Sequence, residues 1–147
     1  MSESIKTWKD IDKSLLDSLP NPDKRAYEIK LKVPECTFLG VKEQPDYAVI
    51  YMSFYPGDRI IELKSMKYYF FQLRNIVVSY ERLINIVYDH FMEVYEPERL
   101  RLVMICNPRG GISSRLTIDS DWEARGGKEK FRDWEAGHND DAWNVVM

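Results

Sequence analysis

The chain has 147 residues, of which 44% are apolar and 13% are aromatic, and a formal net charge of -3. This composition is typical of one globular domain and excludes a disordered or fibrous chain. No window approaches the roughly 18 consecutive apolar residues of a membrane span, and no apolar stretch follows a basic start. We therefore expect no membrane helix, no signal peptide and a cytoplasmic location.

Cysteine and histidine are scarce, which limits the metal and redox chemistry of the chain. Cys36 and Cys106 are too far apart for a CxxC site and are expected to be free thiols. His90 and His138 are too few for a histidine cluster, so we predict no metal site. The 24 acidic residues outnumber the 21 basic ones, which argues against broad binding to the phosphate backbone of nucleic acid. A nucleotide ligand is therefore expected to be small.

Strand patterns begin after a polar segment. Residues 1–26 have one weakly helical stretch and two late prolines, and they are predicted to form an N-terminal arm. Apolar and charged residues alternate over 27–33, which predicts a half-buried strand that Pro34 ends. Residues 46–55 are rich in Val, Ile, Tyr and Phe and predict a second strand, which the apolar pair 60–61 continues after a Pro-Gly turn.

Two helices follow these strands. Ser65 is placed to cap a first helix, in which apolar residues recur at helical spacing from Met66 to Leu73. Over 80–95 the apolar residues fall on one broad face and the polar residues on the other, which predicts a second, amphipathic helix. Pro97 marks its end.

Two further strands complete the predicted domain. Residues 99–106 and 113–119 are strand-like, and the turn-prone segment 107–111 separates them. The order is β-β-α-α-β-β over a domain at 27–119. Residues 120–147 show no sustained period and contain three tryptophans, so they are predicted to form an acidic tail. These tryptophans are expected to dock against the domain or a neighbouring subunit, and a lid over a site is the alternative.

The segment 62–67 places Lys64, Ser65 and Lys67 around the start of the first predicted helix. Backbone N–H groups and the helix dipole favour an anion at such a position. The segment is therefore a candidate phosphate site. Ordinary solvated lysines on a helix surface are the alternative, because this spacing alone is common.

Three other positions could support chemistry. Within 107–111, the glycines would let the backbone approach a ligand and Arg109 offers a planar fork for carboxylate or phosphate, although the segment also suits a tight hairpin turn. Asp46 precedes a strand and is a candidate proton donor or a turn cap. Glu81 suits the positive end of a helix, and one carboxylate can also accept two parallel N–H bonds from a guanine-type ring.

Taken together, these segments resemble the queuosine-pathway nitrile reductase family (QueF), whose members reduce 7-cyano-7-deazaguanine with NADPH. The resemblance spans about residues 27–119 and rests on PE.T.L (34–39), QPDYA (44–48), ELKSMKYYFFQLRN (62–75), the SYE segment with Asn85 behind it (79–85) and NPRGGIS (107–113). ELKSMKYY fits the family's NADPH motif and is the most specific segment. The resemblance implies NADPH as cofactor and an α+β tunnelling fold (T-fold), whose subunits associate side by side into an oligomeric barrel with substrate sites between them.

The resemblance also implies a role for each residue that matches a family motif. Asp46 matches the family's proton-transferring aspartate, and Glu81 lies where its substrate-recognising glutamate lies. The positions implied for cofactor binding are Glu62, Lys64, Ser65, Lys67, Arg109 and Gly110.

Two of the family's catalytic residues have no counterpart here. The loop that should hold its nucleophilic cysteine is one residue shorter, so that Gly40 or, in a shifted alignment, Leu39 takes that position, and neither is a nucleophile. The position of its histidine is taken by Tyr80. The family's thiolate adds to the nitrile carbon and gives a thioimide that NADPH can reduce. Cys36, roughly 13 Å from Gly40 along an extended chain, and Cys106 are the two thiols that could replace it.

The sequence thus predicts an NADPH-dependent reductase that transfers hydride to a C=N bond of an imine-type heterocycle without a thioimide. A protonated C=N bond already accepts hydride, so a proton from Asp46 or Tyr80 would suffice. Three alternatives stay open: the nitrile reductase itself with a relocated cysteine, the amidine-forming branch that lacks the cofactor motif, and a non-catalytic purine-like or pterin-like binding subunit. We expect self-association, and neither a nucleic acid nor a membrane partner.

Overall fold

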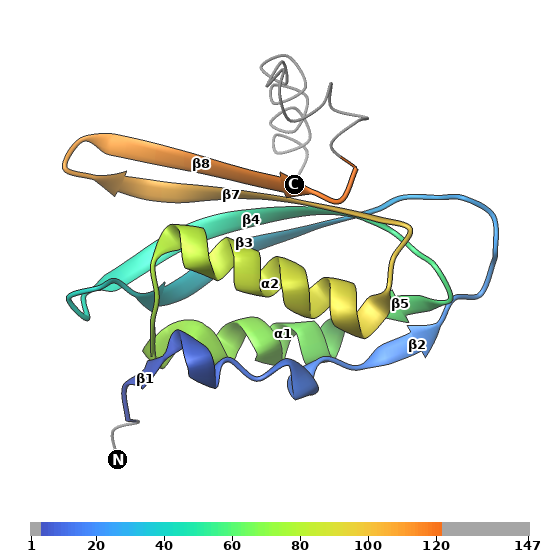
Figure 1. Ribbon diagram of the computed structural model, residues 1–147, viewed down its shortest axis with the longest axis horizontal. Helices are drawn as coiled ribbons and strands as arrows, with labels where there is room; N and C mark the ends of the chain where they lie inside the picture. The colour runs from blue at the N-terminus through green and yellow to red at the C-terminus, as the bar shows by residue number, and fades with distance from the viewer. Residues whose placement is uncertain (1–3, 122–147) are drawn as a thin grey trace.

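The computed structural model describes residues 4–121 of the chain (Figure 1). The main elements are β3 (Ile29–Leu39), β4 (Pro45–Tyr55), α1 (Leu63–Phe71), α2 (Tyr80–Tyr95), β7 (Arg99–Arg109) and β8 (Ile112–Asp119). The short elements are β1 (Lys6–Thr7), η1 (Trp8–Asp10), η2 (Lys13–Leu15), β2 (Ser18–Pro20), β5 (Arg59–Ile61), η3 (Gln72–Asn75) and β6 (Ile76–Val77). The main elements follow the predicted order β-β-α-α-β-β.

The sheet is antiparallel through its four long strands. Its strand order is β1-β6-β3-β4-β7-β8, and β2 pairs with β5 in a separate ribbon. Ala48 on β4 pairs with Cys36 on β3 and with Cys106 on β7. Both helices lie on one face of this sheet (Figure 1). The predicted α+β class with an antiparallel sheet and two helices is therefore confirmed.

The core lies between the helices and the sheet. Strands and helix α2 supply most of its fully buried side chains, among them Ile50, Met52, Phe54, Leu83, Val87, Phe91, Leu100, Leu102 and Met104. On β4 and β7 these residues alternate with the other face of the sheet, because side chains of a strand repeat with a period of two. On α2 they follow the helical period that the sequence showed. This burial fixes α2 across the sheet.

The prediction that Pro34 ends the first strand is wrong. β3 continues to Leu39, and its register with β4 shifts between Val33 and Cys36. This β-bulge tolerates a proline, because the bulged residue needs no N–H for the ladder. Within the described residues, β3 meets β6 only at Leu39, so the other edge of β3 is open at Pro34 as well.

The predicted cap of the first helix is also wrong. The N-cap is Glu62, whose carboxylate accepts the N–H groups of Lys64 and Ser65 at 2.8 and 2.9 Å. Ser65 is buried in the first turn, where its hydroxyl donates to the Glu62 carbonyl at 2.7 Å and accepts the N–H of Asp17 at 2.9 Å. The Ser65 hydroxyl is thus hydrogen-bonded to the N-terminal segment instead of capping the helix. The local sequence does not reveal this contact.

The N-terminal segment packs on the two helices. Ile11 and Leu16 are buried in the core, and the Tyr95 hydroxyl donates to the Asp17 carbonyl at 2.9 Å. Figure 1 shows this segment running along α1. The division of the chain into an arm, a domain and a tail stays a prediction.

The predicted tail lies almost entirely outside the described residues, as do Trp122, Trp134 and Trp143. No helix in the described part of the chain is long and apolar enough to cross a membrane. Over the same residues, no group of three or more His, Cys, Asp or Glu side chains could hold a metal ion.

Candidate active site

A cavity of about 350 Å³ opens at one end of the domain. The β3–β4 hairpin, the start of α2 and the end of β7 meet there, at the left of Figure 1. Its lining residues are Gly40, Val41, Lys42, Gln44, Asp46, Val78, Ser79, Tyr80, Glu81 and Arg109. The structure therefore brings together Asp46, Tyr80, Glu81 and Arg109, four of the residues that the sequence singled out.

Asp46 and Tyr80 form a hydrogen-bonded pair at this cavity. Asp46 is only 4% exposed, and its Oδ1 accepts the Tyr80 hydroxyl at 3.0 Å. The Phe38 ring packs edge-on against Tyr80 with 5.9 Å between ring centroids. Burial, and secondly the Asp46 carboxylate, raises the pKa of Tyr80. The phenol therefore holds its proton and points it at a carboxylate.

Arg109 supplies the positive charge beside this pair. Its Nη2 lies 3.4 Å from Oδ1 of Asp46 and donates a hydrogen bond to the Pro45 carbonyl. The guanidinium acts against the rise in the pKa of Tyr80, because a neighbouring cation favours the phenolate. A phenol, a carboxylate and a guanidinium thus meet at one point.

The glycines that follow Arg109 form a hairpin turn. β7 extends to Arg109, three residues beyond the predicted strand, and β8 begins at Ile112. Gly110 and Gly111 have φ angles of +58° and +80°, the left-handed values that a two-residue hairpin turn needs. The hairpin interpretation of this segment is therefore confirmed. A cofactor contact at Gly110 stays a prediction.

Glu81 lies in the first turn of α2 and lines the cavity. Ser79 caps the helix by accepting the N–H of Arg82 at 3.3 Å, so the carboxylate of Glu81 is not used as the cap. Its side chain is exposed and has no ion-pair partner among the described residues. The carboxylate is therefore available to a ligand at the positive end of a helix.

In the β3–β4 hairpin, the side chain of Gln44 lies where a side chain at Gly40 would be. The N–H of Gly40 donates to the Gln44 carbonyl at 2.7 Å, and Glu43 adopts φ +63° in the tight loop between them. A Cβ built on Gly40 would lie 2.1 Å from Nε2 of Gln44. The Gln44 amide therefore fills the space that a side chain at residue 40 would need.

The two cysteines of the described chain are buried on the helix side of the sheet. Cys36 is 0% exposed and Cys106 is 2% exposed. Burial is the main reason that the pKa of Cys36 is raised to about 12. Burial, and secondly the charges of Asp46 and Glu81, raise the pKa of Cys106 to about 12 as well. Both groups are therefore protonated thiols near neutral pH, whereas a cysteine nucleophile has to be a thiolate.

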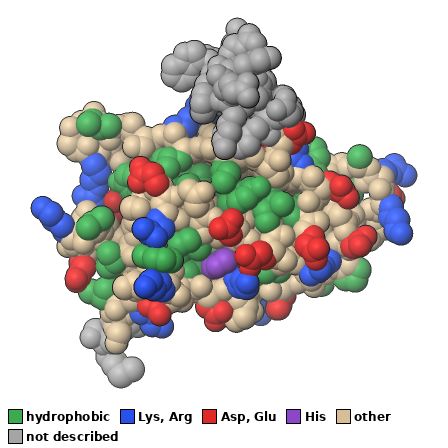
Figure 2. Space-filling model, viewed as in Figure 1, with side chains coloured by type: hydrophobic (Ala, Val, Ile, Leu, Met, Phe, Trp, Pro, Cys, Tyr) green, Lys and Arg blue, Asp and Glu red, His purple; other side chains and the backbone are tan. Residues whose placement is uncertain are grey.

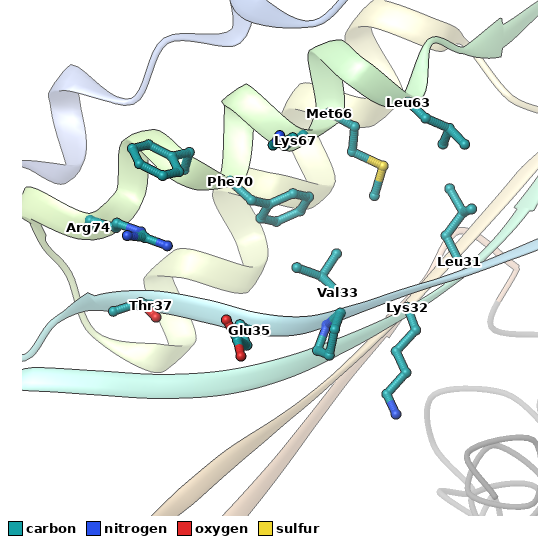
Figure 3. Close-up of a pocket in the computed structure, with 12 residues that line it drawn as sticks. Leu31, Lys32, Val33, Glu35, Thr37, Leu63, Met66, Lys67, Phe70 and Arg74 are labelled. Atoms are coloured by element: carbon teal, nitrogen blue, oxygen red, sulfur yellow. The ribbon is translucent and has the colours of Figure 1, made fainter. Parts of the chain in front are cut away.

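The predicted cofactor segment lies at the opposite end of the domain. Figure 1 shows α1 beginning beside β5, whereas α2 begins beside the cavity. Leu63 of α1 faces Leu31 of β3, while Asp46 pairs in register with Phe38 of the same strand (Figure 3). Leu31 and Phe38 are seven residues apart on β3, which is at most about 23 Å at about 3.3 Å per residue. The start of α1 therefore lies well away from the Asp46 cavity within one chain, and Lys67 lies one helical turn nearer to it.

A second cavity, of about 520 Å³, lies between α1 and β3 (Figure 3). Met66 and Phe70 of α1 point toward Leu31 and Val33 of β3 and form its apolar walls. Lys67 and Arg74 line it as well, together with the exposed ring of Phe71.

Lys64 and Lys67 are exposed, and neither forms an ion pair with a described residue. Cations beside an apolar cleft fit the phosphates and flat rings of a dinucleotide. The backbone amides of Lys64 and Ser65 are already bonded to Glu62, so the lysine side chains are the groups that remain free for phosphate. Figure 2 shows that positive and negative side chains are otherwise interspersed over the helical face.

Comparison with known proteins assigns the chain to a family. Residues 45–125 match the family described as QueF-like protein. The NADPH-dependent 7-cyano-7-deazaguanine reductase of Sulfurimonas denitrificans is 35% identical over 119 residues, which cover 80% of this chain and 94% of that protein. The chain belongs to the QueF-like family. A relative of the same name from Prochlorococcus marinus is 39% identical over 104 residues, covering 67% of this chain and 75% of that protein.

The fold of this QueF-like chain agrees with a solved structure. The crystal structure of the archaeosine synthase QueF-Like in the apo form matches with a TM-score of 0.59 and 12% identity, over 63% of this chain and 92% of that chain. At this identity the likeness concerns the fold alone, and it confirms the predicted tunnelling fold of the subunit. The predicted family is confirmed as well.

Sequence reasoning missed two residues of the cavity. Gln44 opens the QPD segment, but only Asp46 in that segment was given a role. Lys42 lies in the hairpin loop and lines the same cavity. The signal that could have found Gln44 is the period of two, which sets residues 44 and 46 on one face of an extended chain.

Proposed function

We propose that this chain is an NADPH-dependent reductase that transfers hydride to the C=N bond of an imine-type heterocycle without a covalent thioimide. Membership of the family, whose relatives bear the name NADPH-dependent reductase, supports an oxidoreductase acting on C–N bonds. One observation supports the non-covalent route. The cavity joins a phenol, a carboxylate and a guanidinium, while both thiols of the described chain are buried with raised pKa values.

Tyr80 is the proton donor in this proposal. Its raised pKa keeps it protonated at neutral pH, and Asp46 holds the hydroxyl at the cavity wall. Reduction of a C=N bond places hydride on the carbon and a proton on the nitrogen. The phenolate left after proton transfer would lie beside the Arg109 guanidinium, which stabilises negative charge there. Asp46 orients the donor and keeps it close to the substrate.

Glu81 and the cavity volume suit a small heterocycle. A carboxylate accepts paired N–H groups from the edge of a guanine-type ring. A cavity of about 350 Å³ is within the range of small-ligand sites. A 7-deazaguanine with a C=N substituent is therefore one substrate that the cavity suits.

NADPH supplies the hydride when it is bound. Lys64 and Lys67 would hold its phosphates, because they are exposed and free of ion pairs within the described residues. Met66 and Phe70 offer an apolar wall beside them. Ser65 would support the cofactor site indirectly, by holding the start of α1 in place, because its hydroxyl is already hydrogen-bonded to the backbone of Asp17 and Glu62.

A complete site would need two copies of the chain. The start of α1, which carries the lysines, lies away from the Asp46 cavity of the same domain, so the lysines of one copy would serve the cavity of another. The outer edges of β3 and β8 have no long strand partner within the described residues. Open strand edges pair readily with other strands, which suits side-by-side association of sheets into a homo-oligomer.

A second candidate is reduction of 7-cyano-7-deazaguanine itself, with Cys106 as a relocated nucleophile. The position of Cys106 favours it, because this thiol lies close enough to Asp46 and Glu81 for both charges to raise its pKa. The relatives named above also bear this activity in their names. The reaction would need Cys106 to become exposed and ionised.

The test follows NADPH binding by cofactor fluorescence and NADPH consumption by absorbance. Two probes are offered, 7-cyano-7-deazaguanine and a small cyclic imine. We expect both the wild-type protein and the Cys106→Ser variant to bind NADPH and to reduce the imine. Turnover of the nitrile that Cys106→Ser abolishes would favour the second candidate. Absence of NADPH binding would contradict both.

A further inference from the structure

The side chain of Gln44 takes the place of a side chain at residue 40. A Cβ on Gly40 would lie 2.1 Å from Nε2 and 2.6 Å from Cδ of Gln44, both closer than side-chain atoms approach one another. Gly40 itself is buried, so the Gln44 amide covers it. The glycine therefore permits the glutamine to fold across the hairpin.

The orientation of the Gln44 amide is fixed by the backbone of the loop. The N–H of Lys42 donates to Oε1 of Gln44 at 3.0 Å, which assigns the oxygen to that side. Nε2 has no hydrogen-bond partner among the described residues, and Gln44 lines the cavity. Gln44 directly precedes β4, Asp46 is the second residue of that strand, and both line the cavity. A free N–H donor therefore stands on the side of the hairpin that carries Asp46.

We propose that Gln44 positions the substrate, with Nε2 donating a hydrogen bond to the ring carbonyl oxygen of a purine-like heterocycle. In a guanine-type ring this oxygen adjoins the N–H edge, which a carboxylate such as Glu81 accepts. A donor and an acceptor on the same cavity complement these adjacent groups. The inference rests on the proposed function, because it requires that this cavity take a heterocycle.

The test compares guanine with 2-aminopurine. Guanine has the ring carbonyl and the N1–H beside it, and 2-aminopurine lacks both, so the comparison is of each probe between wild type and variant. Calorimetric titration of the Gln44→Ala variant is expected to show about tenfold weaker binding of guanine, the size of one hydrogen bond. Binding of 2-aminopurine should change less than about twofold, because the carbonyl that the amide would bind is absent.

The Gly40→Ala variant provides an independent route to the same result. It leaves Gln44 in place but pushes its amide away, so it should reproduce the selective loss of guanine binding. Gln72→Ala is the matched control, because the Gln72 amide bonds Asp12 at the other side of the domain. The control should leave binding of both probes unchanged.

The outcomes separate this inference from the proposed function. Equal losses of binding for guanine and 2-aminopurine, or no loss in either the Gln44→Ala or the Gly40→Ala variant, would overturn the role of Gln44. If the same protein binds NADPH, the proposed reductase would not be affected by that result. A wild-type protein that binds NADPH and neither purine would also overturn it. Selective loss of guanine binding in a protein that does not bind NADPH would support Gln44 and contradict the reductase.

Discussion

The cavity and the start of α1 differ in how their charged side chains are paired. At the cavity, Asp46 accepts a hydrogen bond from Tyr80 and faces Arg109. At the start of α1, Lys64 and Lys67 are exposed and form no ion pair with a described residue. The first end is suited to hold a proton beside a small ring, and the second to receive an anion from outside. Neither end alone provides every part of a reductase site.

The largest effect is expected at the cavity. Tyr80→Phe removes the hydroxyl but keeps the ring that packs on Phe38. We predict that kcat for the imine probe falls about 100-fold or more, the usual size of a lost general acid. NADPH binding should stay within twofold of wild type, as about twofold is within the scatter of such measurements. Unchanged kcat in steady-state assays would show that the proton comes from another group.

The next largest effect is expected at the lysines. The double change Lys64→Ala and Lys67→Ala should weaken NADPH binding by about tenfold for each lysine, since a hydrogen bond to a charged group contributes about 1.5 kcal/mol. The loss should be smaller at high salt, where exposed charges are screened. Lys24→Ala, which changes an exposed lysine in the loop before β3, is the control. Equal losses in the control would mean that only net charge matters.

The pH dependence of the reaction tests the state of Tyr80. Burial and the Asp46 carboxylate raise the pKa of Tyr80. The proton-donating phenol is therefore fully present at neutral pH and is lost only as pH rises past the ordinary tyrosine value of about 10. Asp46→Asn removes the neighbouring charge and should move the alkaline fall in kcat to lower pH. A fall that does not move in this variant would rule out Tyr80 as the titrating donor.

A smaller effect is expected on stability. Ser65→Ala leaves the N–H of Asp17 without its partner and should lower the free energy of unfolding by about 1–3 kcal/mol. Thermal denaturation followed by circular dichroism measures this change. Ser113→Ala on β8, where the serine is exposed, should have little effect. Equal melting temperatures for the two variants would contradict the structural role of Ser65.

Sequence reasoning succeeded where periodicity decides the structure. α2 was predicted at its observed bounds because its apolar face is continuous over four turns. The end of the first strand was missed because Pro34 lies at a bulge, and bulges depend on the partner strand. The cap of α1 was missed because Asp17, far away in sequence, holds Ser65.

The residues of the candidate site could be predicted from the sequence only in part. Asp46, Tyr80, Glu81 and Arg109 were singled out one by one, and the fold brings them to one cavity. The amide of Gln44 was missed because its position depends on the backbone of the loop at 40–44. The distance between the cavity and the lysines of α1 could not be read from motif order, since α1 and α2 begin at opposite ends of the sheet.

The central claim is that the two ends, in different copies of the chain, make one reductase site. Mixing the Tyr80→Phe protein with the Lys64→Ala, Lys67→Ala protein, after dissociation and reassembly, tests it most directly. We predict that the mixture, assayed at an NADPH concentration too low to saturate the lysine variant, regains NADPH-dependent imine reduction well above the sum of the two impaired parents. Some sites then combine an intact Tyr80 with intact lysines. A mixture no more active than its parents would contradict the claim.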